Sequence, residues 1–184
     1  DDAVRLIRKD NPFPTVCALI CEHPCEVKCR RNIIDAPVNI RGIKRFAVDN
    51  CSETVPVPER MDRTGKKVAV IGGGPSGLSA AYFLSIMGHD VTVFEKRAQL
   101  GGMLRYGIPS YRLPRERLQW DIDAIASTGV EFQTDFDIAS ESAIAEIKEK
   151  YDAMYLSIGS HNFKNLGIPG EFAKGVISAV EMLR

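Results

Sequence analysis

The apolar pattern changes its period twice between Lys67 and Lys96. A short apolar run rich in β-branched residues, 68–71, predicts a buried strand. From Leu78 to Ile86 the apolar side chains recur at helical spacing, and 91–94 returns to an apolar run of strand type. Strand, helix and strand within about 30 residues predict a βαβ unit.

The rest of the chain continues this alternation. Helical spacing predicts helices at 1–9, 40–48, 115–127 and 140–150, whereas 130–133 and 152–158 have strand patterns, the latter of the buried type. Alternating strands and helices predict an α/β fold: a Rossmann-like domain whose parallel sheet is covered on both faces. Ligand is then expected at the carboxyl ends of the strands, where Gly72, Glu95 and Gly159 fall.

The region before this alternation has a different composition. We expect a helical, cysteine-rich domain at residues 1–55, a linker at 56–66 and the Rossmann-like domain at 67–184. The stretch VPVPE, residues 55–59, spans the start of this linker, and its prolines favour an extended course. Neither end of the chain carries a helix-capping signal, so we expect a piece of a longer polypeptide.

Lysine plus arginine and aspartate plus glutamate both number 24, so the formal net charge is zero. This balance does not favour nucleic acid or a membrane surface as a partner. The N-terminus lacks the features of an export signal, and we expect a soluble cytoplasmic protein.

A glycine-rich loop, GGGPSG, joins the first strand of the βαβ unit to its helix. Its spacing, G-x-G-x-x-G, is typical of dinucleotide sites: Gly72 allows a tight turn, Gly74 lets a pyrophosphate approach and Gly77 lets helix and strand pack closely. Pro75 completes the loop and Ser76 begins the helix, whose N-terminal N–H groups and dipole favour a phosphate.

Glu95 ends the second strand, close to the expected spacing of about 20 residues after the loop. A carboxylate there accepts hydrogen bonds from ribose hydroxyls and disfavours a 2′-phosphate. The following loop contains Gly101, Gly102 and Gly107, where backbone can approach a flat or anionic ligand.

Four of the five cysteines form the run C-x3-C-x3-C-x3-C: Cys17, Cys21, Cys25 and Cys29. Disulfides would need an oxidising compartment, which the lack of an export signal disfavours. Zinc sites usually pair short C-x2–4-C arms across a longer loop, which an unbroken x3 series matches poorly. An iron–sulfur cluster suits closely spaced thiolates beside a redox nucleotide, and we favour it over zinc.

No pairing of a nucleophile with a base is visible, and the three histidines share no spacing. We therefore assign no catalytic residue, and we interpret Cys51 as a packed side chain.

The cysteine run, the glycine loop and the segment GGMLRYGIPSYRLP occur here in the same order as in a known family. Together they make the sequence resemble the small (beta) subunit of NADPH-dependent glutamate synthase and the N-terminal part of dihydropyrimidine dehydrogenase. That resemblance implies a helical domain with two [4Fe-4S] clusters, then an FAD domain interrupted by an NADPH domain that would lie outside this chain.

Carried over by position, the resemblance implies that the 72–77 loop holds the FAD pyrophosphate and Glu95 the adenosine ribose. It places a second set of residues around the rest of the cofactor: Lys96, Gly101, Gly102, Met103 and Arg112 on the flavin side, Ile138 near the adenine, and the 157–160 strand end, with Gly159, opposite.

The sequence departs from the family at two places. The family's upstream cysteine group is absent, so Cys17 need not be a ligand, and Lys44 stands where some members have a Gln or Glu ligand.

The resemblance implies an NAD(P)H-dependent flavoprotein oxidoreductase that passes electrons through FAD and iron–sulfur clusters to a partner redox subunit of the large-subunit type. The alternative is a non-catalytic nucleotide-binding module with a zinc-bound cysteine knot.

Overall fold

The computed structural model describes residues 1–52 and 56–183. The end of the expected N-terminal domain, 53–55, and the last residue of the expected Rossmann-like domain, Arg184, lie outside the described residues. Val55, the first residue of the stretch VPVPE, is among those outside.

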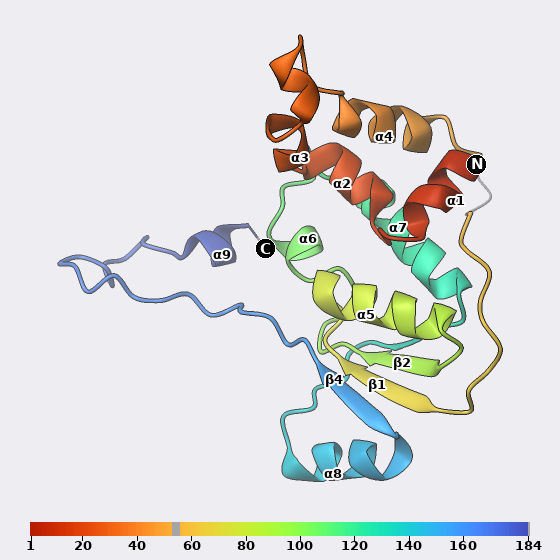
Figure 1. The fold of residues 1–184 in the computed structure, drawn as a ribbon. Coiled ribbons are helices and arrows are strands. Elements are labelled where there is room, and N and C mark those ends of the chain that lie inside the picture. The colour runs from red at the N-terminus through yellow and green to blue at the C-terminus, as the bar shows by residue number, and fades with distance from the viewer. Residues whose placement is uncertain (53–55, 184) are drawn as a thin grey trace.

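A four-stranded parallel sheet forms the base of the fold (Figure 1). Its strands are β1 (Lys67–Ile71), β2 (Asp90–Phe94), β3 (Glu131–Gln133) and β4 (Ala153–Leu156), in the spatial order β3-β2-β1-β4. All three pairings are parallel. The expected Rossmann-like sheet is therefore confirmed, and its carboxyl ends share one edge.

Helices cover both faces of this sheet. α5 (Pro75–Ile86) lies on one face with α7 (Arg115–Ser127) outside it, and α8 (Glu141–Lys150) lies on the other (Figure 1). α5 is the helix of the βαβ unit, and it is followed by Gly88, whose positive φ of 92° ends the helical course. A short helix that the sequence pattern did not predict, α6 (Met103–Tyr106), interrupts the glycine-containing loop.

The N-terminal region is helical. It contains α1 (Asp2–Arg8), α2 (Pro14–Ile20), α3 (Pro24–Val27), the 3-10 helix η1 (Arg30–Ile33) and α4 (Ile40–Asp49). α2 packs against both α4 and α7, so the cysteine-rich region is stacked on the outer helix of the Rossmann-like region. Near the C-terminus, α9 (Ala179–Met182) follows a long irregular segment.

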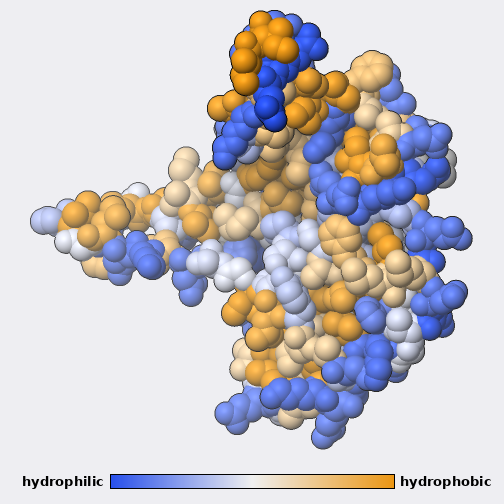
Figure 2. All heavy atoms as spheres, in the orientation of Figure 1, coloured by the Kyte–Doolittle hydropathy of each residue, from blue (hydrophilic) through white to orange (hydrophobic). Residues whose placement is uncertain are grey.

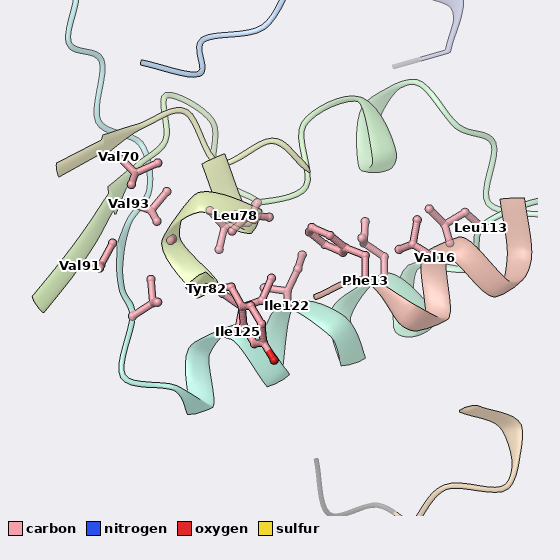
Figure 3. Packing of buried hydrophobic residues seen from close by; sticks show 14 residues of the cluster. Phe13, Val16, Val70, Leu78, Tyr82, Val91, Val93, Leu113, Ile122 and Ile125 are labelled. Carbon is pink, nitrogen blue, oxygen red and sulfur yellow. The ribbon is translucent and has the colours of Figure 1, made fainter. Parts of the chain in front are cut away.

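One hydrophobic core joins these layers (Figure 3). It runs from Val70 on the sheet through Leu78 of α5 and Ile122 of α7 to Phe13 and Val16 at the start of α2. Burial of this apolar surface stabilises the stacking of α2 on the Rossmann-like helices as well as the sheet itself.

Side chains on the opposite sheet face form a second, smaller core. Ala69 and Ile71 alternate with their buried β1 neighbours and pack with Phe94 and Ile147 of α8. This alternation is the period-2 geometry of a strand buried on both faces.

The expectation that 152–158 is buried is wrong. β4 is an edge strand, and Leu156 and Ile158 are 70% and 73% exposed. The chain after β4 runs away from the sheet instead of packing back over it (Figure 1). An apolar run predicts a strand, but its burial depends on whether another segment packs over it.

Apolar side chains are also exposed on the cysteine-rich region. Figure 2 shows orange and blue spheres side by side at the top of the view, over the segment that holds Val27, Ile33 and Ile34. Within residues 1–52 and 56–183, no helix has both the length and the apolar character needed to cross a lipid bilayer.

The buried core generates a first prediction. Leu78 is 0% exposed, and Leu78→Ala should lower the free energy of unfolding by about 2–5 kcal/mol because it removes buried methyl groups and leaves a cavity. Leu156→Ala, at an exposed position, should change it by less than about 0.5 kcal/mol. Denaturant unfolding followed by circular dichroism measures both, and equal losses would contradict this core assignment.

Candidate functional site

A cleft of about 940 Å³ opens at the carboxyl ends of the four strands. It lies where the sheet topology predicts a ligand. Ten of the residues expected to bind a cofactor line it: Gly72, Gly74, Pro75, Ser76, Glu95, Lys96, Gly102, Met103, Ile138 and Gly159. These residues come from the segments after all four strands of the sheet, so the fold brings together what the sequence separates.

Close packing at the glycine loop sets the shape of the cleft. Gly72 has a φ of 106°, and a Cβ there would overlap the carbonyl oxygen of Ser157 beside β4. A Cβ on Gly77 would overlap the carbonyl oxygen of Gly72. Because Gly77 lacks a side chain, the first turn of α5 lies directly against the end of β1, and because Gly72 lacks one, the segment after β4 lies against the same loop.

The N-terminus of α5 faces this cleft. Gly74 is its N-cap residue, and no side chain caps the helix. A Cβ on Gly74 would come no nearer than 3.8 Å to another atom, the Cα of Gly102, so this position opens onto free space. Uncapped N–H groups at a helix N-terminus, with the positive end of the dipole, suit a bound phosphate.

Glu95 holds the loop from the neighbouring strand. Its side chain is buried, and its two carboxylate oxygens accept hydrogen bonds from the backbone N–H of Gly73 at 2.7 Å and of Arg97 at 2.9 Å. Each carboxylate oxygen has a second lone pair, so the group can still accept hydrogen bonds from hydroxyl groups in the cleft. Glu95 therefore fixes the loop and offers an acceptor at the same time.

The segment after Glu95 closes one side of the cleft. The N–H of Gly101 donates to the carbonyl oxygen of Gly73 at 2.8 Å, which ties this segment to the glycine loop. Arg105 is buried behind it and donates to the carbonyl oxygen of Leu100 at 2.6 Å and to Gln119 of α7 at 2.7 Å. Burial lowers the pKa of the Arg105 guanidinium. Its role here is to hold the loop.

The opposite wall comes from the loop after β3. Phe136, Asp137 and Ile138 line the cleft there, and Asp137 pairs at 2.8 Å with Lys96 of the loop after β2. Sequence reasoning found Ile138 through the resemblance alone and missed its two neighbours. The signal was available, because the loop after β3 must also lie at the carboxyl edge of a parallel sheet.

Three expected residues do not line the cleft. Gly77 and Gly101 lie behind it, where their missing side chains allow close packing. Arg112 is exposed in the 107–114 loop, outside the lining. His161 and Asn162, which the sequence did not single out for this site, lie in the lining instead.

The cysteine run follows a series of short helices. Cys17 lies within α2, Cys21 caps its C-terminus, Cys25 lies in α3 and Cys29 precedes η1. All are free thiols. Among the described residues, no three His, Cys, Asp or Glu side chains are gathered in a way that would hold a metal ion.

The four thiols differ in their surroundings. Hydrogen bonds from the backbone N–H groups of Val38 and Arg31 lower the pKa of Cys29, whereas burial raises the pKa of Cys17. The sulfur of Cys21 accepts a hydrogen bond from the N–H of His23 at 3.3 Å. The donor chemistry, thiols with N–H groups directed at two of them, fits an iron–sulfur cluster, although the side chains are not gathered around one.

Two family models match the chain. Residues 1–55 match dihydropyrimidine dehydrogenase domain II, described as a 4Fe-4S cluster domain, and residues 70–131 match an NAD(P)-binding Rossmann-like domain. Both matches agree with the architecture: cysteine-bearing helices stacked on a parallel sheet.

Two curated relatives align with most of the chain. The NADPH-Fe(3+) oxidoreductase subunit beta of Geobacter sulfurreducens is 41% identical over 93% of this chain and 26% of its own length. The glutamate synthase [NADPH] small chain of Bacillus subtilis is 37% identical over 99% of this chain and 37% of its own length. The chain thus spans about a quarter to two fifths of these relatives, which are themselves named as subunits.

Among solved structures, FprA of Mycobacterium tuberculosis in complex with NADPH superposes with a TM-score of 0.58. The alignment covers 65% of this chain and 28% of FprA at 24% identity, and it shows the shared fold. Over both its cysteine-bearing helices and its Rossmann-like region, the chain is homologous to the glutamate synthase small chain and to the NADPH-Fe(3+) oxidoreductase beta subunit.

Proposed function

We propose that this chain is part of an FAD- and [4Fe-4S]-containing oxidoreductase of the glutamate synthase small-subunit type. The whole protein takes electrons from NAD(P)H, at a site outside residues 1–184, and delivers them to a partner redox subunit of the large-subunit type. The observation that carries the proposal is the single core joining α2, which bears Cys17, to α5, which begins the cleft.

The cleft residues have distinct roles in this proposal. The N-terminus of α5 holds the FAD pyrophosphate against Gly74, and Glu95 accepts hydrogen bonds from the adenosine ribose. Gly102 and Met103 close the flavin side, and Ile138 packs near the adenine. Bound FAD supplies the conversion of a two-electron hydride into single electrons, so no acid or base from this chain is required.

Cys21, Cys25 and Cys29 are the residues that would hold a cluster, and Cys17 is the fourth candidate. A rival of another class is a nucleotide-binding module with zinc at these cysteines and no redox role. Bound flavin, seen by its visible absorbance in the full-length protein, supports the oxidoreductase. Release of NAD or ADP-ribose on denaturation, with zinc instead of iron, supports the rival.

Gly74 tests the phosphate position. Its φ of −82° suits alanine and its Cβ would come no nearer than 3.8 Å to another atom, so Gly74→Ala should fold normally. The new methyl group would occupy the position of the pyrophosphate, and FAD affinity should fall about tenfold, equivalent to about 1.4 kcal/mol. Flavin titration measures this, and Ser79→Ala, on α5 but outside the cleft lining, is the control. Unchanged affinity would place the phosphates elsewhere.

Glu95 tests the ribose contact. Glu95→Gln keeps the shape of the side chain but removes the charge that strengthens its hydrogen bonds. The NH₂ group of the glutamine would also face one of the two backbone N–H groups that now donate to the carboxylate. FAD affinity should fall about tenfold or more. The matched control is Glu131→Gln on β3, outside the cleft lining. If both variants bind FAD as the parent does, Glu95 serves only the loop.

The cysteines test the order of electron transfer. In the full-length protein, Cys21→Ser, Cys25→Ser or Cys29→Ser should lower iron and sulfide content and stop delivery to the partner, because serine is a poor cluster ligand. NADPH-dependent flavin reduction, followed by stopped flow, should stay nearly intact, as it should in the Cys51→Ser control. Variants that keep iron and a folded flavin site yet lose flavin reduction would show that this order is wrong.

A further inference from the structure

The start of helix α2 is capped from a distant part of the chain. Its N-cap residue, Phe13, has no side-chain oxygen to accept from the first-turn N–H groups, and no neighbouring side chain does so. Instead, one carboxylate oxygen of Asp121, on α7, accepts from the backbone N–H of both Thr15 and Val16 at 3.0 Å. A residue of the Rossmann-like region thus serves as the helix cap of the cysteine-bearing helix.

The same carboxylate is paired with α1. Its other oxygen accepts from Arg8 at 3.0 Å, and both side chains are fully buried. The hydroxyl of Tyr82, on α5, donates to the carbonyl oxygen of Arg8 at 2.7 Å, and the ring of Trp120 lies 4.8 Å from the guanidinium carbon. Three helices, α1, α2 and α7, therefore meet at one buried carboxylate, and α5 joins them through Arg8.

This arrangement is a poor device for stability alone. Burial raises the pKa of Asp121 to about 6 and lowers that of Arg8, since removal of both charges from water opposes ionisation. An apolar pair of similar volume would often serve stability as well. What Asp121 adds is direction, because its hydrogen bonds fix the first turn of α2 at a defined place on α7.

The direction of α2 matters because of the cysteines that the helix carries. Cys17 lies in it, and the N–H of Cys21, at its C-terminal end, donates to the carbonyl oxygen of Cys17 at 3.2 Å. α3, with Cys25, follows almost at once. At the other side of the shared core, the N-terminus of α5 lines the nucleotide cleft.

We propose that Asp121 is a positioning residue that fixes the cysteine run relative to the nucleotide cleft and so governs electron passage from the flavin to the cysteine-bound cluster. The inference rests on the proposed function. In each passage the reduced flavin loses one electron and the cluster gains it, and the hydride from NAD(P)H supplies the pair. Asp121 contacts neither group and acts through α2.

Paired substitutions in the full-length protein test this without leaving a buried charge alone. Arg8→Met/Asp121→Asn keeps an oxygen that can cap α2, whereas Arg8→Met/Asp121→Leu fills the space and removes the cap. Asp123→Asn, on the exposed side of the same helix, is the matched control. If the leucine variant does not fold, Arg8→Met/Asp121→Ala replaces it, with the same expected results.

Two measurements are made on each variant. Amide hydrogen exchange in residues 15–20 should quicken about tenfold in the leucine variant and stay unchanged in the asparagine variant and the control. In stopped flow, NADPH should reduce the flavin at the parent rate in all variants. Cluster reduction after the flavin should slow about tenfold in the leucine variant alone, because fewer molecules hold α2 docked.

A folded leucine variant with full FAD and iron, and with the parent rate of cluster reduction, would overturn the proposal. Unchanged exchange at residues 15–20 would overturn the capping role itself. Failure of the proposed function would look different, because the parent protein itself would then hold no flavin or iron. Amide exchange would in that case still show whether Asp121 caps α2.

Discussion

The contact between the first turn of α5 and the end of β1 is the constraint on which the rest depends. Gly77 lies against the carbonyl oxygen of Gly72, and a single methyl group on Gly77 would push helix and strand apart. This closeness brings the helix N-terminus to the sheet edge and places Leu78 in the core. The cleft is therefore a consequence of the packing of α5 on β1. That packing leaves the N–H groups at the start of α5 facing the cleft, where they can bind a phosphate.

A second constraint extends this order to the cysteine-bearing helices. Their apolar residues Phe13 and Val16 share the core of the Rossmann-like region, but apolar contact is not directional. The hydrogen bonds to Asp121 are directional, and they select one orientation of α2 among those that the core would accept. The cysteine-bearing helices and the Rossmann-like region differ in composition, but they pack together as one unit.

Local patterns predicted the parts of the fold that are determined locally. The βαβ unit, α7 and the carboxyl-edge site follow from periodicity, glycine spacing and parallel topology. The short helices at Pro14–Ile20 and Met103–Tyr106 were missed, because few residues carry a period there. Asp121 was missed for a different reason: on α7 it has the pattern of an ordinary polar position, and its partners lie more than a hundred residues away. No sequence period records such a contact.

The open edge of β4 ties the stability of this segment to its surroundings. In the described part of the chain β4 pairs only with β1, so its other side presents unpaired backbone groups beside the exposed Leu156. Anything that covers this edge binds the folded form alone and shifts the folding equilibrium by mass action. A melting temperature measured for residues 1–184 therefore depends on whether a partner covers this edge, and on the concentration of that partner, as well as on the sequence.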